Sequence, residues 1–301
     1  MDVDTRLLRY FAAIAEEGNL TRAAHRLFVS QPSLTKQLKH LESQLGVRLF
    51  TRSSTGMRLT DAGRAFAARV PPVLAGWDAA VGETRSAARV LRVGFLASAA
   101  GDATQRIVSA FGEVRPGWRV DLEQAPWSDP SAGLATADVP VALLRLPFLG
   151  EEGCKVRVLF SERRCVALPS AHPLACRAEI AFPELWDEPV VVAPALKGAW
   201  RDHWLALSER DGREVCIGAV VEKPDEFLGA VASGHGIALV PASAPHFYAR
   251  PDVVYVPVTG VSPSEIAVAW QPDAGDAVTD FVRCCVDVTR SRRTSCGTRW
   301  G

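Results

Sequence analysis

One side of a short predicted helix near the N-terminus collects polar and cationic side chains. In the string SQPSLTKQLKHLESQL, an apolar stripe with helical spacing is formed by Leu34, Leu38, Leu41 and Leu45. At about 100° per residue, the opposite side carries Pro32, Lys36 and Lys39. Gln31 and Thr35 lie at its shoulder. Amide, hydroxyl and ammonium groups arranged in this way can meet base edges and phosphates in the major groove of double-stranded DNA.

The residues at the two ends of this helix determine where it begins and ends. Ser30 is a type of residue that caps helix N-termini, and Pro32 is tolerated because first-turn amides lack helical partners. Those unpaired amides can also bind a phosphate, so we include Ser30 in the predicted DNA surface. Gly46 is expected to end the helix.

Two further helices are expected before this one. Residues 5–17 show amphipathic spacing, and Gly18 fits the end of that helix. Residues 21–28 form a second, short helix that Asn19 or Thr21 can cap. The three helices together would hold the polar face in place.

The string VRLFTR–SSTG–MRLT, which follows the third helix, predicts two short strands around a turn, a feature known as a wing. Its cations are Arg48, Arg52 and Arg58, and we expect Arg52 to contact a phosphate or the minor groove. Spacing alone leaves a second interpretation open, in which the segment is a plain helical bundle with a basic solvated face.

Residues 5–65 closely resemble the winged helix-turn-helix of LysR-type transcriptional regulators. The resemblance rests on LRYFAAIAEEGNLTRAAHRLFVSQPSLTKQLKHLESQLGVRLFTR, followed by RLTDAG. It implies that bases are approached by Gln31, Pro32, Thr35 and Lys36. It implies that the DNA backbone is held by Thr21, Arg22, Ser33, Lys39 and Arg52. One position departs from the family, because Thr55 stands at the wing turn where many relatives carry a cation.

Residues 61–89 carry a second apolar seam. It consists of Phe66, Val70, Val73, Trp77 and Val81, with Leu59 just before it. In the family this stretch is a linker helix that pairs two subunits, which would suit a near-palindromic operator. Alternatively, the seam packs against the chain's own body. Because proline breaks helices, Pro71 and Pro72 predict a kink near Val70 or two separate helices.

From residue 90 the chain alternates strand-like and helical segments, which indicates an α/β fold with mainly parallel sheets. LRVGF, VALPSAHPLA and GHGIALVP are similar to strings of the LysR effector-binding domain, a two-lobed fold like that of periplasmic binding proteins. We expect a DNA-binding domain at 1–60, a linker at 61–89, an effector-binding domain at 90–290 and a disordered tail at 291–301. Within the effector domain, lobe one would comprise 91–161 and 267–288, and lobe two 162–266.

Ligands of open α/β sheets bind beyond the carboxyl ends of strands. This rule selects as effector-binding residues Ser98, Ala99, Arg145, Pro194 and Ala195. Phe227, on the predicted helix after Pro224, is a further candidate for the wall of the site. Arg145 can clamp a carboxylate with two hydrogen bonds, so an anionic effector is a candidate. The alternative for Arg145 is an ordinary ion pair on the lobe surface.

Charge is unevenly distributed along this chain of zero net charge. Residues 1–70 hold 11 Lys/Arg against 6 Asp/Glu, whereas residues 71–287 hold 19 against 28. A basic head on an acidic body favours contact between the head and a polyanion. We expect a cytoplasmic protein without signal peptide or membrane span, without metal or other cofactor, and without enzymatic activity. The resemblance suggests a homotetramer, whereas the residues support only self-association as a dimer or larger oligomer.

Two rival functions remain open at this point. Cys165, Cys176 or Cys216 could make the protein a thiol-based redox sensor, although Cys165 lies in an apolar strand pattern. Alternatively, the chain is a small-molecule binding protein whose head only mediates oligomerisation. The main hypothesis is a regulator in which an effector changes how the two lobes pack. The packing then sets the angle between paired DNA-reading heads.

Overall fold

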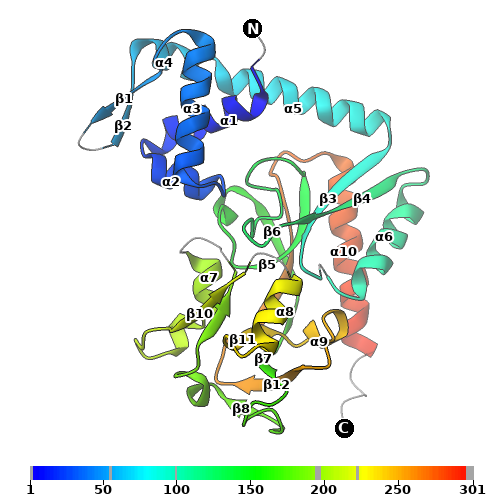
Figure 1. Ribbon diagram of the computed structural model, residues 1–301. Coiled ribbons are helices and arrows are strands. Elements are labelled where there is room, and N and C mark those ends of the chain that lie inside the picture. The colour runs from blue at the N-terminus through cyan, green and yellow to red at the C-terminus, as the bar shows by residue number, and fades with distance from the viewer. Residues whose placement is uncertain (1–2, 54–55, 99, 194–197, 222–223, 296–301) are drawn as a thin grey trace. The chain divides into compact units, whose positions relative to one another are not determined.

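The computed structural model describes residues 3–53, 56–98, 100–193, 198–221 and 224–295. The chain divides into two compact units, residues 1–90 and 91–301, which we call unit one and unit two (Figure 1). Each unit is described by itself.

Three helices form the core of unit one, namely α1 (Thr5–Glu17), α2 (Leu20–Arg26) and α3 (Gln31–Leu45). Gly18 and Gly46 end α1 and α3 in the left-handed conformation, which glycine adopts without strain. Asn19 caps α2, because its side chain accepts hydrogen bonds from the amides of Thr21 and Arg22. The apolar sides of the helices meet in a cluster that includes Leu7, Phe11, Ile14, Ala23, Leu34, Leu38 and Leu41.

The wing consists of β1 (Phe50–Ser53) and β2 (Gly56–Leu59), which pair antiparallel. Glu42 of α3 accepts hydrogen bonds from the amides of Leu49 and Phe50, at 2.7 and 3.2 Å. At Gly56 an added Cβ would lie 2.4 Å from the carbonyl oxygen of Gly18, so no larger residue fits there without a shift. The wing is therefore attached to both α1 and α3.

Two helices follow the wing, α4 (Asp61–Ala67) and α5 (Val70–Ala87), as the proline pair indicated. Both prolines lie in the first turn of α5, where a missing amide costs no helical hydrogen bond. The apolar seam divides between two environments. Val70 and Leu74 pack into the core of unit one, whereas Val73 and Trp77 are 54% and 52% exposed in the single chain.

Lobe one of unit two is a five-stranded sheet in the order β4-β3-β5-β13-β6. The strands are β3 (Val90–Leu96), β4 (Arg119–Ala125), β5 (Val141–Leu146), β6 (Lys155–Glu162) and β13 (Ser264–Trp270), with the short helix η1 (Glu151–Gly153) before β6. One face packs on α6 (Ala103–Val114) and α10 (Asp276–Ser295), which lie side by side in Figure 1. Leu143, Val268 and Phe281 belong to this core.

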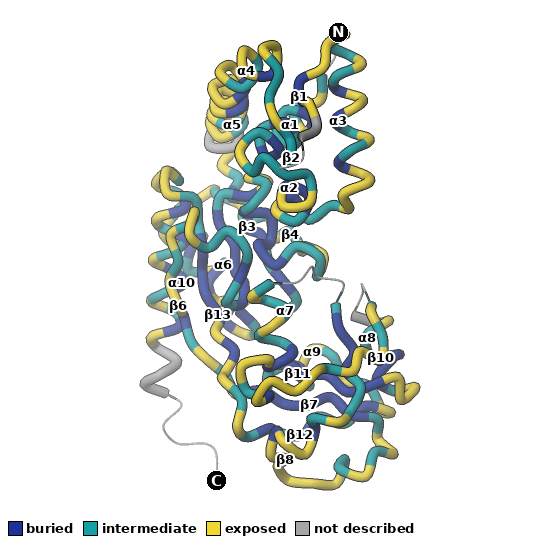
Figure 2. The backbone as a smooth tube through the Cα atoms, turned by 90° about the vertical axis from the view of Figure 1, so that its left-hand side faces the viewer, coloured by how far each residue is buried: buried dark blue, intermediate teal, exposed yellow. Residues whose placement is uncertain are grey.

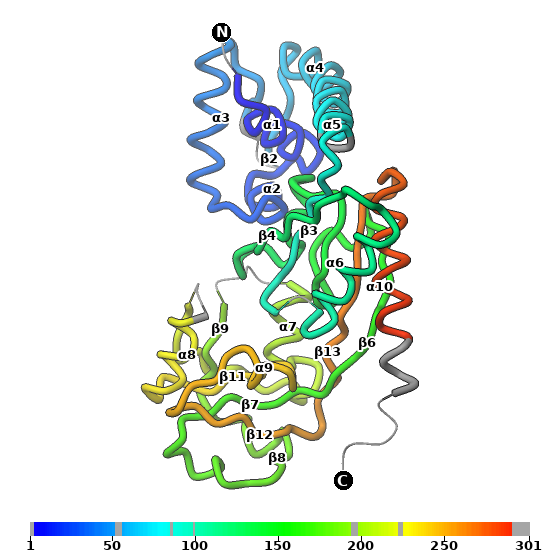
Figure 3. The backbone as a smooth tube through the Cα atoms, turned by 90° about the vertical axis from the view of Figure 1, so that its right-hand side faces the viewer, coloured from blue at the N-terminus to red at the C-terminus, as the bar shows by residue number. Residues whose placement is uncertain are grey.

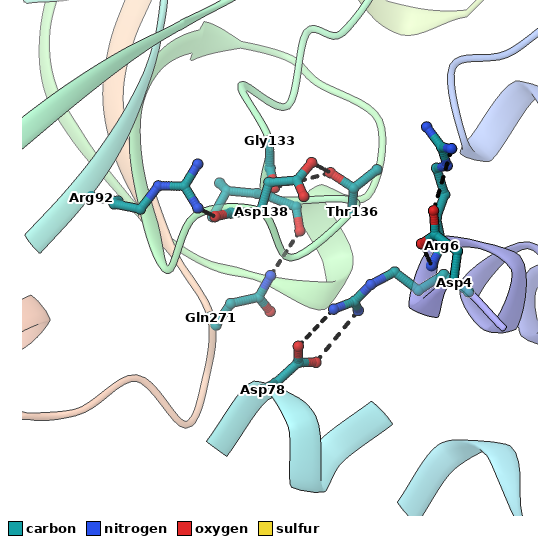
Figure 4. Close-up of polar contacts among 10 residues, drawn as sticks. Asp4, Arg6, Asp78, Arg92, Gly133, Thr136, Asp138 and Gln271 are labelled. Atoms are coloured by element: carbon teal, nitrogen blue, oxygen red, sulfur yellow. Dashed lines mark hydrogen bonds and ion pairs between the residues drawn. The ribbon is translucent and has the colours of Figure 1, made fainter. Parts of the chain in front are cut away.

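The other face of that sheet is covered by the loop at 129–139. Asp129 folds this loop by accepting hydrogen bonds from the amides of Ser131 and Gly133, at 3.0 and 2.8 Å. Figure 4 shows two further attachments: Arg92 donates to the carbonyl oxygen of Asp138, and Gln271 donates to a loop carbonyl, both at 2.8 Å. The loop is thus attached to β3 and to the residue that follows β13.

Lobe two contains a sheet in the order β11-β7-β12-β8 and a parallel pair, β10-β9. The strands are β7 (Arg164–Pro169), β8 (Ile180–Ala181), β9 (Val190–Val192), β10 (Ile217–Val220), β11 (Ala238–Pro241) and β12 (Val253–Thr259). The helices are α7 (Ala199–Trp204), α8 (Pro224–Ala232), α9 (Ala244–Phe247), η2 (Phe182–Leu185) and η3 (Leu207–Glu209). Leu228 and Val231 of α8 pack on the sheet, and Val190 bridges to Ile237.

The prediction of mainly parallel sheets is wrong. β13 runs antiparallel to both β5 and β6, and β7 runs antiparallel to both β11 and β12. The chain leaves lobe one through β6 into β7 and returns through β12 into β13 (Figure 3). Because one strand of each pair leaves and the other returns, β6 and β13 run in opposite directions, and so do β7 and β12. The return crossover lies at 260–263. The boundary expected at Ala267 is therefore too late, because Ser264 already pairs with Glu162 in lobe one.

The expected disordered tail also needs correction. α10 continues to Ser295, so residues 291–295 are helical, and residues 296–301 lie outside the described part of the chain. The string TRSRRTS at 289–295 holds neither proline nor glycine, which agrees with a helix that continues through it.

Candidate DNA interface and ligand pocket

On the side of α3 that is expected to contact DNA, the exposed residues are Ser30, Gln31, Pro32, Ser33, Lys36 and Lys39. Figure 2 shows the burial of the backbone positions along α3. Leu34 and Leu41, on the other side, are 0% and 1% exposed. Neither Lys36 nor Lys39 has an ion-pair partner among the residues that the structure describes. Their ammonium charges are therefore available to an external anion.

Gln31 and Thr35 contact each other on this surface. The Thr35 hydroxyl donates to the carbonyl oxygen of Gln31 at 2.9 Å and accepts from the Gln31 side-chain amide at 3.3 Å. Thr35 is half-buried, whereas Gln31 is exposed. The two side chains thus form one polar unit at the first turn of α3, and a change at either position alters both.

The other expected DNA contacts differ in their surroundings. Thr21 and Arg22 are exposed at the start of α2, but Arg22 pairs with Glu17 at 3.3 Å and donates to the Glu17 carbonyl oxygen. Arg52 lies on β1 opposite Met57, and its side chain lies outside the described part of the structure, as does the wing turn at 54–55.

A cavity of about 930 Å³, counting the part open to solvent, lies between the lobes of unit two. Lobe one contributes Leu96, Ala97, Ser98, Trp127 and Arg145 to its wall. Of the six expected effector residues, Ser98, Arg145 and Phe227 line the cavity. Ala99, Pro194 and Ala195 lie outside the described residues.

Most of the cavity's aromatic wall was not expected from the sequence. It includes Trp127, Trp200, Trp204, Tyr248 and Tyr255. Trp127 of lobe one contacts Phe227 of lobe two edge to face, with ring centroids 5.3 Å apart. A usable sequence signal was AWRDHW after VVVA, because it places tryptophans four residues apart beside a cation on one short helix.

The tyrosines of the wall are neutral. Burial, and then the neighbouring Tyr248, raise the pKa of Tyr255 to about 12. The hydroxyl of Tyr255 donates to the carbonyl oxygen of Tyr248 at 2.6 Å. Burial also raises the pKa of Tyr248. Neither ring therefore brings a negative charge to the cavity near neutral pH.

Arg145 is held between the two crossovers. Its guanidinium lies 2.8 Å from Glu162, at the end of β6, and 2.9 Å from the Ser264 hydroxyl, at the start of β13. Glu162 also accepts hydrogen bonds from the amide and hydroxyl of Ser243, at 2.8 and 3.1 Å. Burial lowers the pKa of Arg145, and the charge of Glu162 opposes this effect. The pair is buried rather than on the lobe surface, and it uses part of the charge that a carboxylate ligand would need.

A second buried arginine fixes the helix that carries the tryptophans. Arg164, 1% exposed, donates to the carbonyl oxygens of Ser262 and His203, both at 2.6 Å, and to the Ser262 hydroxyl at 2.9 Å. Burial lowers the pKa of Arg164 to about 10. Because Ser262 lies in the return crossover and His203 in α7, Arg164 connects the crossover to the wall of the cavity.

His203 should make the stability of unit two depend on pH. Burial, and then the charge of Arg164, lower its pKa from 6.5 to about 4. Between these values the unfolded chain binds more protons, so the free energy of unfolding falls as pH drops from 6.5 toward 4. Allowing for solvent screening, the loss should be about 1–2 kcal/mol. Urea unfolding at pH 7.5 and 5 measures it. In His203→Gln the loss between these pH values should be smaller by that amount, and an unchanged loss would exclude His203 as its source.

Four of the cysteines, including the candidate Cys165, are poorly suited to thiolate chemistry. Burial raises the pKa of Cys165, although the charge of Arg163 opposes the rise. Burial likewise raises the pKa of Cys154, Cys284 and Cys285. A raised pKa disfavours the reactive thiolate, so these four thiols are poor redox sensors.

Within the described ranges, the structure contains no group of three His, Cys, Asp or Glu residues placed to hold a metal ion. None of the described helices has the length and apolar character required to cross a membrane.

The fold and the two sites define a DNA-binding protein with a ligand pocket, and comparison with known proteins identifies its family. Residues 5–64 match the family model described as bacterial regulatory helix-turn-helix protein, lysR family. Residues 84–290 match the model described as LysR substrate binding domain. The chain belongs to the LysR family of transcriptional regulators.

Individual relatives agree with this assignment. The chain is 35% identical over 246 residues to the HTH-type transcriptional regulator TfdS of Cupriavidus pinatubonensis, covering 80% of this chain and 83% of TfdS. Full-length BenM matches with a TM-score of 0.56 and 26% identity, covering 99% of each chain. Full-length CbnR, solved in complex with its target DNA, matches with a TM-score of 0.53 and 26% identity, covering 95% of this chain and 100% of CbnR. The predicted family and fold are confirmed.

Proposed function

We propose that this regulator binds its operator with the exposed side of α3 and changes that binding when a small molecule enters the inter-lobe cavity. One observation carries the proposal: a single chain combines an unpaired cationic helix face with a cavity between two lobes. In this proposal Gln31, Thr35 and Lys36 approach bases, and Lys39 contacts the DNA backbone. The protein acts in the cytoplasm and catalyses no reaction.

Self-association is part of the same proposal. The exposed half of the α5 seam, Val73 and Trp77, would pair with a second copy, and pairing would present two copies of α3 to a near-palindromic operator. CbnR was solved in complex with its target DNA, which supports the same mode of action here.

Sequencing genomic DNA recovered by the purified full-length protein tests the proposal. We expect enrichment of a few fragments with near two-fold symmetric sites, and a change in enrichment when metabolite extract is added. Lys36→Ala should abolish the enrichment while leaving small-molecule binding intact. If recovered fragments are random for the unaltered protein, the head serves only oligomerisation and the proposal fails.

Thr35→Ala and Lys39→Ala should affect DNA binding in different ways. Lys39→Ala should weaken binding to all sequences alike and reduce the salt slope by about 1, because it removes a phosphate contact. Thr35→Ala should change preference by about 1–3 kcal/mol at one base pair, because it removes a hydroxyl that Gln31 also contacts. Fluorescence anisotropy on operator variants at several salt concentrations measures both effects.

Arg106→Ala is the charge-matched control for Lys39→Ala, because it removes an exposed cation from α6 in unit two. It should leave both affinity and salt slope unchanged. Equal losses on every operator variant for Thr35→Ala and Lys39→Ala would contradict the division between base and backbone contacts.

A further inference from the structure

The side of the cavity formed by α7 leaves hydrogen-bond donors without acceptors. Trp200, Arg201 and Trp204 all line the cavity. The indole nitrogens of both tryptophans and the Nε of Arg201 are buried and have no hydrogen-bond partner. Within the described residues, no other element carries more than one such atom. Buried donors without acceptors are costly, so any ligand that brings acceptor atoms to α7 is favoured.

Charge at the cavity favours an anion. The described lining residues include two arginines and no aspartate or glutamate. The charge of Arg145 is partly balanced by Glu162, whereas Arg201 forms no ion pair with a described residue. An aromatic wall can also bind a quaternary ammonium ion, but the guanidinium of Arg201 would repel that cation. A ligand that brings its acceptor atoms to α7 in an anionic group is therefore favoured.

The rest of the wall is apolar and aromatic. Trp127 and Phe227 meet edge to face across the lobes, and Leu96, Val191 and Tyr255 also line the space. Such a wall gains from burying a flat apolar body but offers few partners to a ligand that is polar along its whole length. A dicarboxylate or a sugar would leave part of its polar surface without hydrogen bonds.

We propose that the cavity binds an aromatic monocarboxylate, with its ring against Trp127 and Phe227 and its carboxylate at Trp200, Arg201 and Trp204. This inference rests on the proposed function and names the chemical class of its effector. The carboxylate oxygens accept from the three donors of α7, and the guanidinium of Arg201 balances their charge. The ring fills the apolar space between the lobes.

Calorimetric titration of the full-length protein with a matched panel tests the class. The panel contains phenylacetate, 2-naphthylacetate, their primary amides, succinate and phenyltrimethylammonium. We expect at least one aromatic carboxylate to bind at least ten-fold more tightly than its amide, and more tightly than succinate or the ammonium compound. The inference is overturned if an amide, succinate or the ammonium ion binds best, or if neither carboxylate has a dissociation constant below about 1 mM.

Three tryptophan substitutions test the location. Trp200→Phe and Trp204→Phe remove an indole N–H but keep a ring, and each should weaken carboxylate binding at least five-fold. Trp186→Phe is the matched control, because the buried indole nitrogen of Trp186 is also unpartnered but this residue does not line the cavity. It should change binding less than two-fold. Equal effects of the three substitutions would remove α7 from the site.

Arg201→Gln separates charge from shape. It should weaken binding of the carboxylate at least ten-fold and binding of the amide less than three-fold, whereas equal losses would overturn the assignment.

DNA recovery with the same samples distinguishes a failure of this inference from a failure of the proposed function. Carboxylate binding without sequence-selective DNA recovery would sink the proposed function alone. Selective DNA recovery that responds only to another class of compound would sink this inference alone.

Discussion

Glu162→Leu should lower the free energy of unfolding of unit two by about 3–5 kcal/mol, because it leaves a buried cation without its partner. Arg145 is 4% exposed, and its guanidinium lies 2.8 Å from the Glu162 carboxylate. The neutral hydroxyl of Ser264 would remain as a partner, but it cannot balance the charge. The amide and hydroxyl of Ser243 would lose their acceptor as well. Urea unfolding followed by circular dichroism measures the change.

Two further variants identify the cause of that loss. Glu162→Leu combined with Arg145→Met should recover most of the stability, because replacing both members of a buried ion pair with apolar residues is often neutral. Glu179→Leu is the matched control: Glu179 pairs with Arg163 at 2.6 Å, but both side chains are exposed. It should cost less than about 1 kcal/mol. A double variant as unstable as Glu162→Leu would show that the unpaired charge of Arg145 is not responsible.

The local structure of unit one was predictable because its signals are local. Ser30 and Gly46 mark the ends of α3 with side chains and backbone conformations that depend on few neighbours. The leucine stripe determines which side of α3 is buried, and hence which side is left for DNA. The wing side chains at Arg52 and the turn after it lie outside the described residues, so the expected contact there stays a prediction.

The pocket was predictable only in part, because its wall comes from segments far apart in the chain. The rule about strand ends found Ser98 and Arg145, and the predicted helix after Pro224 supplied Phe227. It missed Trp127 and Tyr255, which reach the cavity only because the lobes face each other. It also did not indicate that Arg145 meets Glu162, since that contact depends on antiparallel crossover strands lying side by side.

Arg164→Met should destabilise unit two by about 2–4 kcal/mol, because it leaves two buried carbonyl oxygens without their donor. Those oxygens belong to His203, in the wall helix α7, and to Ser262, in the return crossover. We also expect amide hydrogen exchange to become about ten-fold faster or more in residues 199–209 and 260–263, because these segments lose their common attachment. Exchange measured by mass spectrometry on the full-length protein tests this expectation.

Arg164→Lys retains the charge but cannot reproduce the planar fork that reaches three acceptors. The exchange rates of Arg164→Lys in these two segments should therefore lie between those of the unaltered protein and those of Arg164→Met. Faster exchange spread evenly over unit two would mean that Arg164 supports the whole lobe rather than these two segments. The distinction matters for regulation, because a ligand shifts a conformational equilibrium only through contacts that differ between the states. A ligand on Trp200 and Trp204 touches the helix that Arg164 ties to the crossover, so the same guanidinium would carry any movement of α7 to the strands that join the lobes.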